Sequence, residues 1–140
     1  MKSDENCLLI LRMNINNMSA DVSRLANESY ISLETYRKNK KSIKTPVWFI
    51  VNHENIYVVT KENTGKVKRI RYNGDVKIAP CNFKGKITGD WIHGQARIVS
   101  SDEQEELIKK RNEKYGFKAT LANLFTRGKG NYVVIEVKIL

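Results

Sequence analysis

Residues 60–66 combine two threonines, a glycine and a lysine in an arrangement that suits a phosphate group. Thr60 ends an apolar run, and Thr64, Gly65 and Lys66 open an expected helix. The first N–H groups of a helix have no partner within it, and the helix dipole favours a negative charge there. Threonine hydroxyls donate hydrogen bonds, glycine permits close approach and lysine adds a full charge. The segment therefore predicts a phosphate site; the alternative is that Thr64 only caps the helix and the lysines lie in solvent.

The elements around this segment predict a mainly β protein. Six segments alternate apolar and polar residues or are rich in β-branched ones, and are expected to be strands: residues 30–36, 43–51, 56–60, 76–81, 86–100 and 131–140. Four segments have helical spacing or capping signals: residues 19–28, 64–72, 101–115 and 118–125. Strands and helices do not alternate regularly, so we expect an α+β antiparallel barrel or sheet and not a Rossmann fold. In the strand at 86–100, Gly89 and Gly94 predict bulges or close backbone approach.

Composition predicts one globular domain with an affinity for anions. The chain has 140 residues, a net charge of +10 and a pI near 9.7, which favours nucleic acid, an anionic membrane surface or a phosphorylated cofactor. Cys7 and Cys81 are too far apart in sequence for a metal or disulfide motif, so a cytoplasmic protein without metal is expected. We expect residues 1–17 to be a flexible extension and residues 18–140 to form the domain.

The spacing Thr60-x-x-x-Thr64-x-Lys66 resembles the T-x-x-x-S-x-K signature of the pyridoxamine 5'-phosphate oxidase superfamily, the FMN-binding split barrels. The segments ISLETYRKN, TPVWFIV, GKVKRIR and KIAPCNFKGKITGDWIHGQARIV also look like the flavin- or deazaflavin-dependent oxidoreductase branch of this superfamily. The resemblance covers the chain from about residue 20 to its end. It implies a six-stranded antiparallel split β-barrel that forms a homodimer, with two cofactor sites at the subunit interface.

The resemblance also implies roles for individual residues. Thr60, Thr64 and Lys66 would hold the phosphate of FMN or of a deazaflavin coenzyme, with Gly65 between them. Four consecutive residues would lie along the ring system, largely through their backbone: Thr45, Pro46, Val47 and Trp48. For Trp48 the alternative is that it is an ordinary core residue. Three further cations would serve either the phosphate or an acidic tail of the coenzyme: Lys68, Arg69 and Arg71.

Trp91 and His93 alternate on the strand expected at residues 86–100 and so share one face of it. They are candidates to line the substrate or cofactor pocket, with His93 as a proton donor. The alternative is that they pack within the barrel or at the subunit interface. No other catalytic residue is identified. The cationic cluster that follows the first strand is expected to be a solvated hairpin tip: Arg37, Lys38, Lys40 and Lys41.

The resemblance therefore implies an FMN- or deazaflavin-dependent oxidoreductase that transfers hydride or electrons to a small organic substrate. The histidine-containing substrate motif of the pyridoxamine phosphate oxidases is missing near the C-terminus, so we expect another substrate. One alternative is a flavin-binding protein without turnover. A less favoured alternative is a basic nucleic-acid-binding domain with aromatic stacking residues. Neither a nucleic acid nor a membrane is the expected partner.

Overall fold

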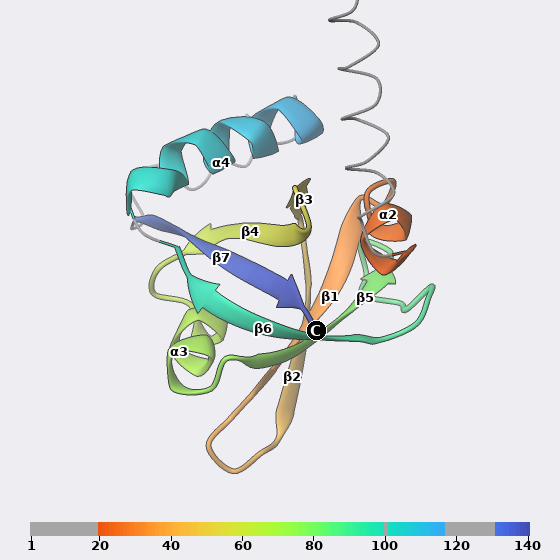
Figure 1. Ribbon diagram of the computed structural model, residues 1–140. Coiled ribbons are helices and arrows are strands. Elements are labelled where there is room, and N and C mark those ends of the chain that lie inside the picture. Colours follow the sequence, from red (N-terminus) through yellow and green to blue (C-terminus); the bar gives the residue numbers. More distant parts are fainter. Residues whose placement is uncertain (1–19, 100, 117–130) are drawn as a thin grey trace, which may run out of the picture.

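The computed structural model describes residues 20–99, 101–116 and 131–140, and its main feature is one antiparallel sheet of seven strands that curls on itself (Figure 1). The strands are β1 (Tyr30–Tyr36), β2 (Ser42–Val47), β3 (Ile50–Asn52), β4 (Asn55–Lys61), β5 (Asp75–Cys81), β6 (Ile92–Ile98) and β7 (Tyr132–Ile139). Their order in the sheet is β2-β1-β5-β6-β7-β4-β3.

The two edge strands of this sheet are neighbours in the chain. Only Trp48 and Phe49 separate β2 from β3, and so short a connection spans no more than about 10 Å. The two edges of the sheet therefore lie close together, and the sheet is curled into a half-barrel that is open between them.

This connection corrects the prediction of six strands, because the strand expected at residues 43–51 is two strands. Val47 pairs with Ile31 on β1, whereas Ile50 pairs with Tyr57 on β4. Phe49, between them, is 1% exposed. The run from Val47 to Ile50 is apolar throughout, so its sequence does not reveal where the chain leaves one edge and joins the other.

The strand expected at residues 86–100 is also shorter than predicted. β6 begins at Ile92, and the residues before it form a loop with one isolated bridge between Cys81 and Ile87. The predicted close approach at both glycines is confirmed. A Cβ atom on Gly89 would meet the ring of Pro80, and one on Gly94 would lie 2.6 Å from Cγ1 of Val137.

Three helices are described: α2 (Ala20–Leu25), α3 (Gly65–Tyr72) and α4 (Ser101–Tyr115). They agree with three of the predicted helices, and α4 is followed directly by Gly116, which has a φ of +53°. The helix predicted at residues 118–125 and the extension predicted at residues 1–17 lie outside the described residues. None of the described helices is long and apolar enough to cross a bilayer.

The core fills the inside of the curled sheet. Val67 and Ile70 of α3 are buried there in one apolar cluster with Leu33 and Ile78 of the sheet. On the outside, α4 covers β3, β4 and β7 (Figure 1), with Leu107 in a second apolar cluster. The burial of Val67 and Ile70 fixes α3, and with it the segment that the sequence assigned to phosphate.

The close packing at Gly94 gives a test of the fold. Gly94→Ala should lower the free energy of unfolding by about 1–3 kcal/mol, because the new methyl group would overlap Val137 in a packed core. Urea denaturation of the purified protein measures this change. Gln95→Ala, at an exposed position on the same strand, should stay within about 0.5 kcal/mol of the parent. Equal effects of the two substitutions would contradict the packing described here.

Candidate cofactor site

The start of α3 presents backbone N–H groups that lack a side-chain cap. Thr64 occupies the N-cap position with an extended backbone, as predicted, but makes no side-chain cap hydrogen bond. Its hydroxyl instead donates to the carbonyl of Lys61 at 3.0 Å. The first backbone bond of the helix runs from the N–H of Lys68 to the carbonyl of Thr64. The N–H groups of the first turn before Lys68 therefore have no partner within the helix.

Lys66 lies beside these N–H groups and carries a charge that is not neutralised. Its side chain is partly buried, and it forms no ion pair or hydrogen bond with any described residue. Burial, and then the positive charge of Arg69, lower the pKa of Lys66. The first turn of α3 contains no acidic residue. An anion here would relieve both causes of the shift, because it would pair with the ammonium group and screen it from Arg69.

Arg69 is the second cation of this site, and the β1 strand holds it in place. Its Nε atom donates to Oγ1 of Thr35 at 2.6 Å, and Thr35 is fully buried. A Cβ atom on Gly65 would lie 2.7 Å from Nη1 of Arg69, so the guanidinium group covers the glycine. Burial, and then the charge of Arg37, lower the pKa of Arg69. The sequence assigned three cations either to the phosphate or to an acidic tail of the coenzyme. Of these three, Arg69 is the one that the structure fixes beside the first turn of α3.

The other two of those cations, and Thr60, have different surroundings. Lys68 is exposed. Arg71 forms an exposed ion pair of 3.5 Å with Glu62. Thr60, on β4 opposite Val133, is 7% exposed. The structure thus brings Thr64, Gly65, Lys66 and Arg69 together at the start of α3, and Thr60 is buried in the strand that precedes it.

The residues predicted to lie along a ring system are on and beside β2. Thr45 and Val47 pair with β1, and Pro46 is exposed. The strand pairs on one side only among the described residues, so its other edge has unpaired backbone groups. Trp48 stacks on the ring of Tyr115 in α4, with ring centroids 4.6 Å apart and planes 13° from parallel. The structure therefore gives Trp48 a packing partner within the chain.

Tyr115 and Lys114 fix this connection between β2 and β3, and neither was singled out from the sequence. The hydroxyl of Tyr115 accepts from the N–H of Phe49 at 2.9 Å, and the carbonyls of Phe49 and Ser29 lie at the same distance to receive its one proton. Nζ of Lys114 donates to the carbonyl of Phe49 at 2.9 Å and lies 3.7 Å from the centre of its ring. Burial raises the pKa of Tyr115 to about 12, so the hydroxyl stays protonated at neutral pH.

Trp91 and His93 do not share a strand face, because Trp91 precedes β6. Nζ of Lys44 lies 5.2 Å from the centre of a Trp91 ring, which places Trp91 near β2. His93 is exposed on β6 opposite Lys77, and its carbonyl accepts from the N–H of Leu140. His93 borders a shallow hollow of about 540 Å³ whose lining does not include Thr64, Gly65, Lys66 or Arg69.

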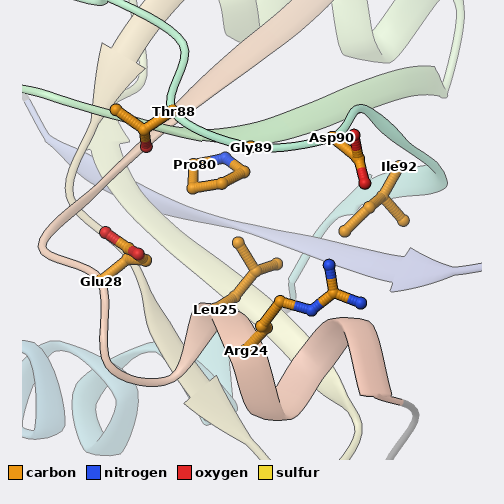
Figure 2. Close-up of a pocket in the computed structure, with 8 residues that line it drawn as sticks. All are labelled: Arg24, Leu25, Glu28, Pro80, Thr88, Gly89, Asp90 and Ile92. Carbon is orange, nitrogen blue, oxygen red and sulfur yellow. The ribbon is translucent and has the colours of Figure 1, made fainter.

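A smaller pocket of about 180 Å³ lies between α2 and the loop that leads into β6 (Figure 2). Leu25, Pro80 and Ile92 provide apolar surface, and Figure 2 shows Arg24 on the side of Asp90, with Glu28 on the side of Thr88. Because this pocket carries charges of both signs, it suits a phosphate less well than the start of α3 does. Among the described residues, no group of histidine, cysteine, aspartate or glutamate side chains could hold a metal ion.

Comparisons with known proteins agree with the fold. A family model described as pyridoxamine 5'-phosphate oxidase matches residues 19–140. The heme storage protein HutZ from Vibrio cholerae has a similar structure, with a TM-score of 0.64 and 11% identity over 88% of this chain and 90% of that one. A NimC/NimA family protein from Clostridium acetobutylicum has a TM-score of 0.59 and 18% identity, over 89% and 82% of the two chains.

An F420 reductase is also similar, with a TM-score of 0.56 and 15% identity over 84% of this chain and 91% of that one. Identities this low show a shared fold and nothing finer. No curated protein sequence matches the chain.

The contacts of Tyr115 predict a stabilising role for its hydroxyl. Tyr115→Phe should lower the free energy of unfolding by about 1–3 kcal/mol, because it leaves the N–H of Phe49 without a partner while keeping the stack on Trp48. Urea denaturation again provides the measurement. Tyr72→Phe is the matched control, since Tyr72 is 60% exposed and should tolerate the change. A Tyr115→Phe protein as stable as the parent would refute the proposed role of the hydroxyl.

Proposed function

Because the chain belongs to the pyridoxamine 5'-phosphate oxidase family, we propose that it is an oxidoreductase that binds FMN or a deazaflavin coenzyme between two copies of itself. Its substrate would be a small organic molecule that takes up hydride or electrons. The observation that carries this proposal is the pair of cations, Lys66 and Arg69, beside the uncapped start of α3. FMN and deazaflavin coenzymes both carry a phosphate that such a site fits.

The chain's residues match the charge and hydrogen bonding of a phosphate group. Two positive side chains face an anion that carries close to two negative charges at neutral pH. The N–H groups of Gly65 and Lys66 add donors in the direction favoured by the helix dipole. Thr64 supplies a hydroxyl that rotates away from the carbonyl of Lys61 to donate to the phosphate. Gly65 leaves room for the guanidinium of Arg69 beside the first turn, since any larger residue would meet it.

The open edge of β2 is the proposed place for the ring system. On an edge strand every second residue turns its backbone N–H and C=O groups away from the paired strand. Alternate residues of the run Thr45, Pro46 and Val47 would therefore recognise the polar rim of a flavin without requiring particular side chains; proline contributes only its carbonyl. The bound flavin or deazaflavin supplies the hydride chemistry. The chain contributes binding, orientation and the exclusion of water, which the second copy completes by covering the gap between β2 and β3.

A binding protein without turnover is the second candidate. It is favoured by the position of His93, which the structure keeps outside the lining of the α3 site. A protein that binds flavin but does not pass electrons from a chemical reductant to any acceptor in a broad panel would fit this second candidate. Cytoplasmic location and an unidentified small substrate remain part of the first proposal.

The phosphate assignment makes a quantitative prediction for FMN binding. Lys66→Met should raise the Kd for FMN about 10- to 100-fold, which is the loss expected for one charge-assisted contact. Quenching of flavin fluorescence during titration measures the Kd. Riboflavin, which lacks the phosphate, should bind the parent and Lys66→Met alike, and Lys109→Met on α4 should leave FMN binding unchanged. If Lys66→Met binds FMN as tightly as the parent does, the phosphate assignment is wrong.

The lowered pKa of Lys66 predicts how binding depends on pH. The free protein holds Lys66 charged below this lowered pKa and loses the proton as the pH rises through it toward 10.5. FMN affinity relative to riboflavin should therefore fall across that alkaline range, because the neutral amine no longer attracts the phosphate. The ratio of the two affinities should be flat in Lys66→Met. A fall of the same size in the variant would assign the effect to another group.

The lowered pKa of Lys66 also determines how the free energy of unfolding of the ligand-free protein changes with pH. The unfolded chain keeps a proton on Lys66 up to about pH 10.5, whereas the folded chain releases it at lower pH. The contribution of Lys66 to the free energy of unfolding therefore rises with pH across this interval. With FMN bound, the contribution of Lys66 to the free energy of unfolding should instead fall as the pH rises, since FMN favours the charged lysine.

A further inference from the structure

A pocket of about 300 Å³ lies between α3 and the hairpin that joins β1 to β2. Tyr36, Arg37 and Lys38 line it from the hairpin, and Lys68, Arg69 and Tyr72 line it from the helix. We call it the hairpin–helix pocket. It adjoins the proposed phosphate site at Gly65 and Arg69, but Lys66 and Thr64 are not part of its lining.

The hairpin is internally bonded, so that its cations have defined positions. The N–H of Arg37 donates to the carbonyl of Lys41, and the N–H of Lys40 donates to the carbonyl of Arg37, both at 2.9 Å. Lys40 takes a φ of 69°, and the N–H of Lys41 donates to the side chain of Asn39. The sequence predicted a solvated tip here. Although the cations are exposed, the turn directs Arg37 and Lys38 to the helix.

The pocket combines almost entirely apolar walls with four cationic side chains whose stems form part of those walls. The rings of Tyr36 and Tyr72, together with the apolar stems of the lysine and arginine side chains, provide flat surfaces. Nζ of Lys38 lies 5.1 Å from the centre of the Tyr72 ring and so reaches from the hairpin toward the helix. Tyr72 is 60% exposed, which leaves its ring available for stacking.

The charges of the pocket are unbalanced. Its lining holds four cations and no carboxylate: Arg37, Lys38, Lys68 and Arg69. The guanidinium groups of Arg37 and Arg69 repel each other, and Arg69 cannot move away because Thr35 holds its Nε atom. Its terminal nitrogens remain to bind a ligand. Burial, then a hydrogen bond to Glu34 and the negative charges of Glu34 and Asp75, raise the pKa of Tyr36, so its hydroxyl stays protonated and its ring serves as a wall of the pocket.

The flat aromatic walls and the cationic side chains of the pocket fit a ligand that is flat at one end and anionic at the other. Stacking on an aromatic side chain stabilises a bound ring, and guanidinium groups bind phosphate and carboxylate through two parallel hydrogen bonds. The volume is at the lower end for small-molecule sites, which limits the ligand to about the size of a mononucleotide.

We propose that the hairpin–helix pocket binds a planar aromatic phosphate or carboxylate, and that this second ligand occupies the protein together with the cofactor. The site goes beyond the proposed function, because the cofactor would be held by Lys66 and the edge of β2. A substrate or an electron-donating nucleotide of this chemistry would then lie next to the cofactor phosphate. The two sites adjoin at Arg69 and Gly65, so the two ligands would be neighbours, with Arg69 within reach of both.

Isothermal titration of the full chain with 5'-AMP and with phenyl phosphate tests the proposal. At least one of these probes should bind with a Kd below about 1 mM in the presence of saturating FMN. Adenosine and inorganic phosphate, which carry the ring or the anion alone, should each bind at least tenfold more weakly. Failure of both aromatic phosphates to bind, or equal binding of inorganic phosphate, would overturn the proposal.

Variants separate this pocket from the cofactor site. Tyr72→Ala and Lys38→Ala should each raise the Kd of the bound probe about five- to tenfold and leave the Kd for FMN unchanged. Phe83→Ala and Lys109→Ala are matched controls, since Phe83 is 66% exposed and Lys109 is an exposed lysine on α4. Lys66→Met should weaken FMN and not the probe. Displacement of the probe by FMN, or full binding by both pocket variants, would show that no separate site exists.

Discussion

The start of α3 places Lys66 and Arg69 side by side, and no described carboxylate neutralises either of them. Partial burial of two like charges is unfavourable, so the rest of the fold has to hold them there. Val67 and Ile70 anchor the helix in the core, and Thr35 fixes the guanidinium of Arg69 from the neighbouring sheet. A protein that maintains such repulsion against its own stability is prepared for an anionic ligand.

The curl of the sheet determines what lies around that anion site. Because β2 and β3 are the two edges and only two residues join them, the half-barrel stays open along one line. The connection between these edges is held from outside by α4, whose Tyr115 bonds to the backbone of Phe49 and stacks on Trp48. β1 connects the open edge of β2 to the start of α3, because it pairs with β2 along its length and its Thr35 bonds to Arg69; we call this arrangement the frame. This frame is the part that the proposed cofactor and second subunit would complete.

Local features of the sequence predicted a large part of this arrangement, and contacts between distant residues account for most of the rest. The strand ending at Thr60, the helix from Gly65 and its buried stripe follow from short-range spacing. The role of Arg69 could not be decided from the sequence because its partner on β1 is 34 residues away. The spacing of residues along a helix does not reveal such a distant contact. Tyr115 was missed for the same reason, since its partner Phe49 is 66 residues away.

The errors in the strands have a related cause. An apolar run through Trp48 is compatible with one continuous strand and with a crossing between two sheet edges, and only the pairing partners distinguish them. Trp91 and His93 satisfied an alternating pattern, but the chain forms a loop up to Trp91 because Gly89 packs against Pro80. Alternation shows which residues would share a face if a strand formed, and it does not show where the strand begins.

A crystal structure of the protein grown with FMN tests the central claim most directly. The account predicts two copies of the chain, with the phosphate of each FMN within hydrogen-bond distance of Nζ of Lys66 and of the N–H groups that open α3. The ring would lie along the edge of β2. A structure in which side chains of the second copy fill the start of α3, or in which the phosphate binds elsewhere, would contradict it.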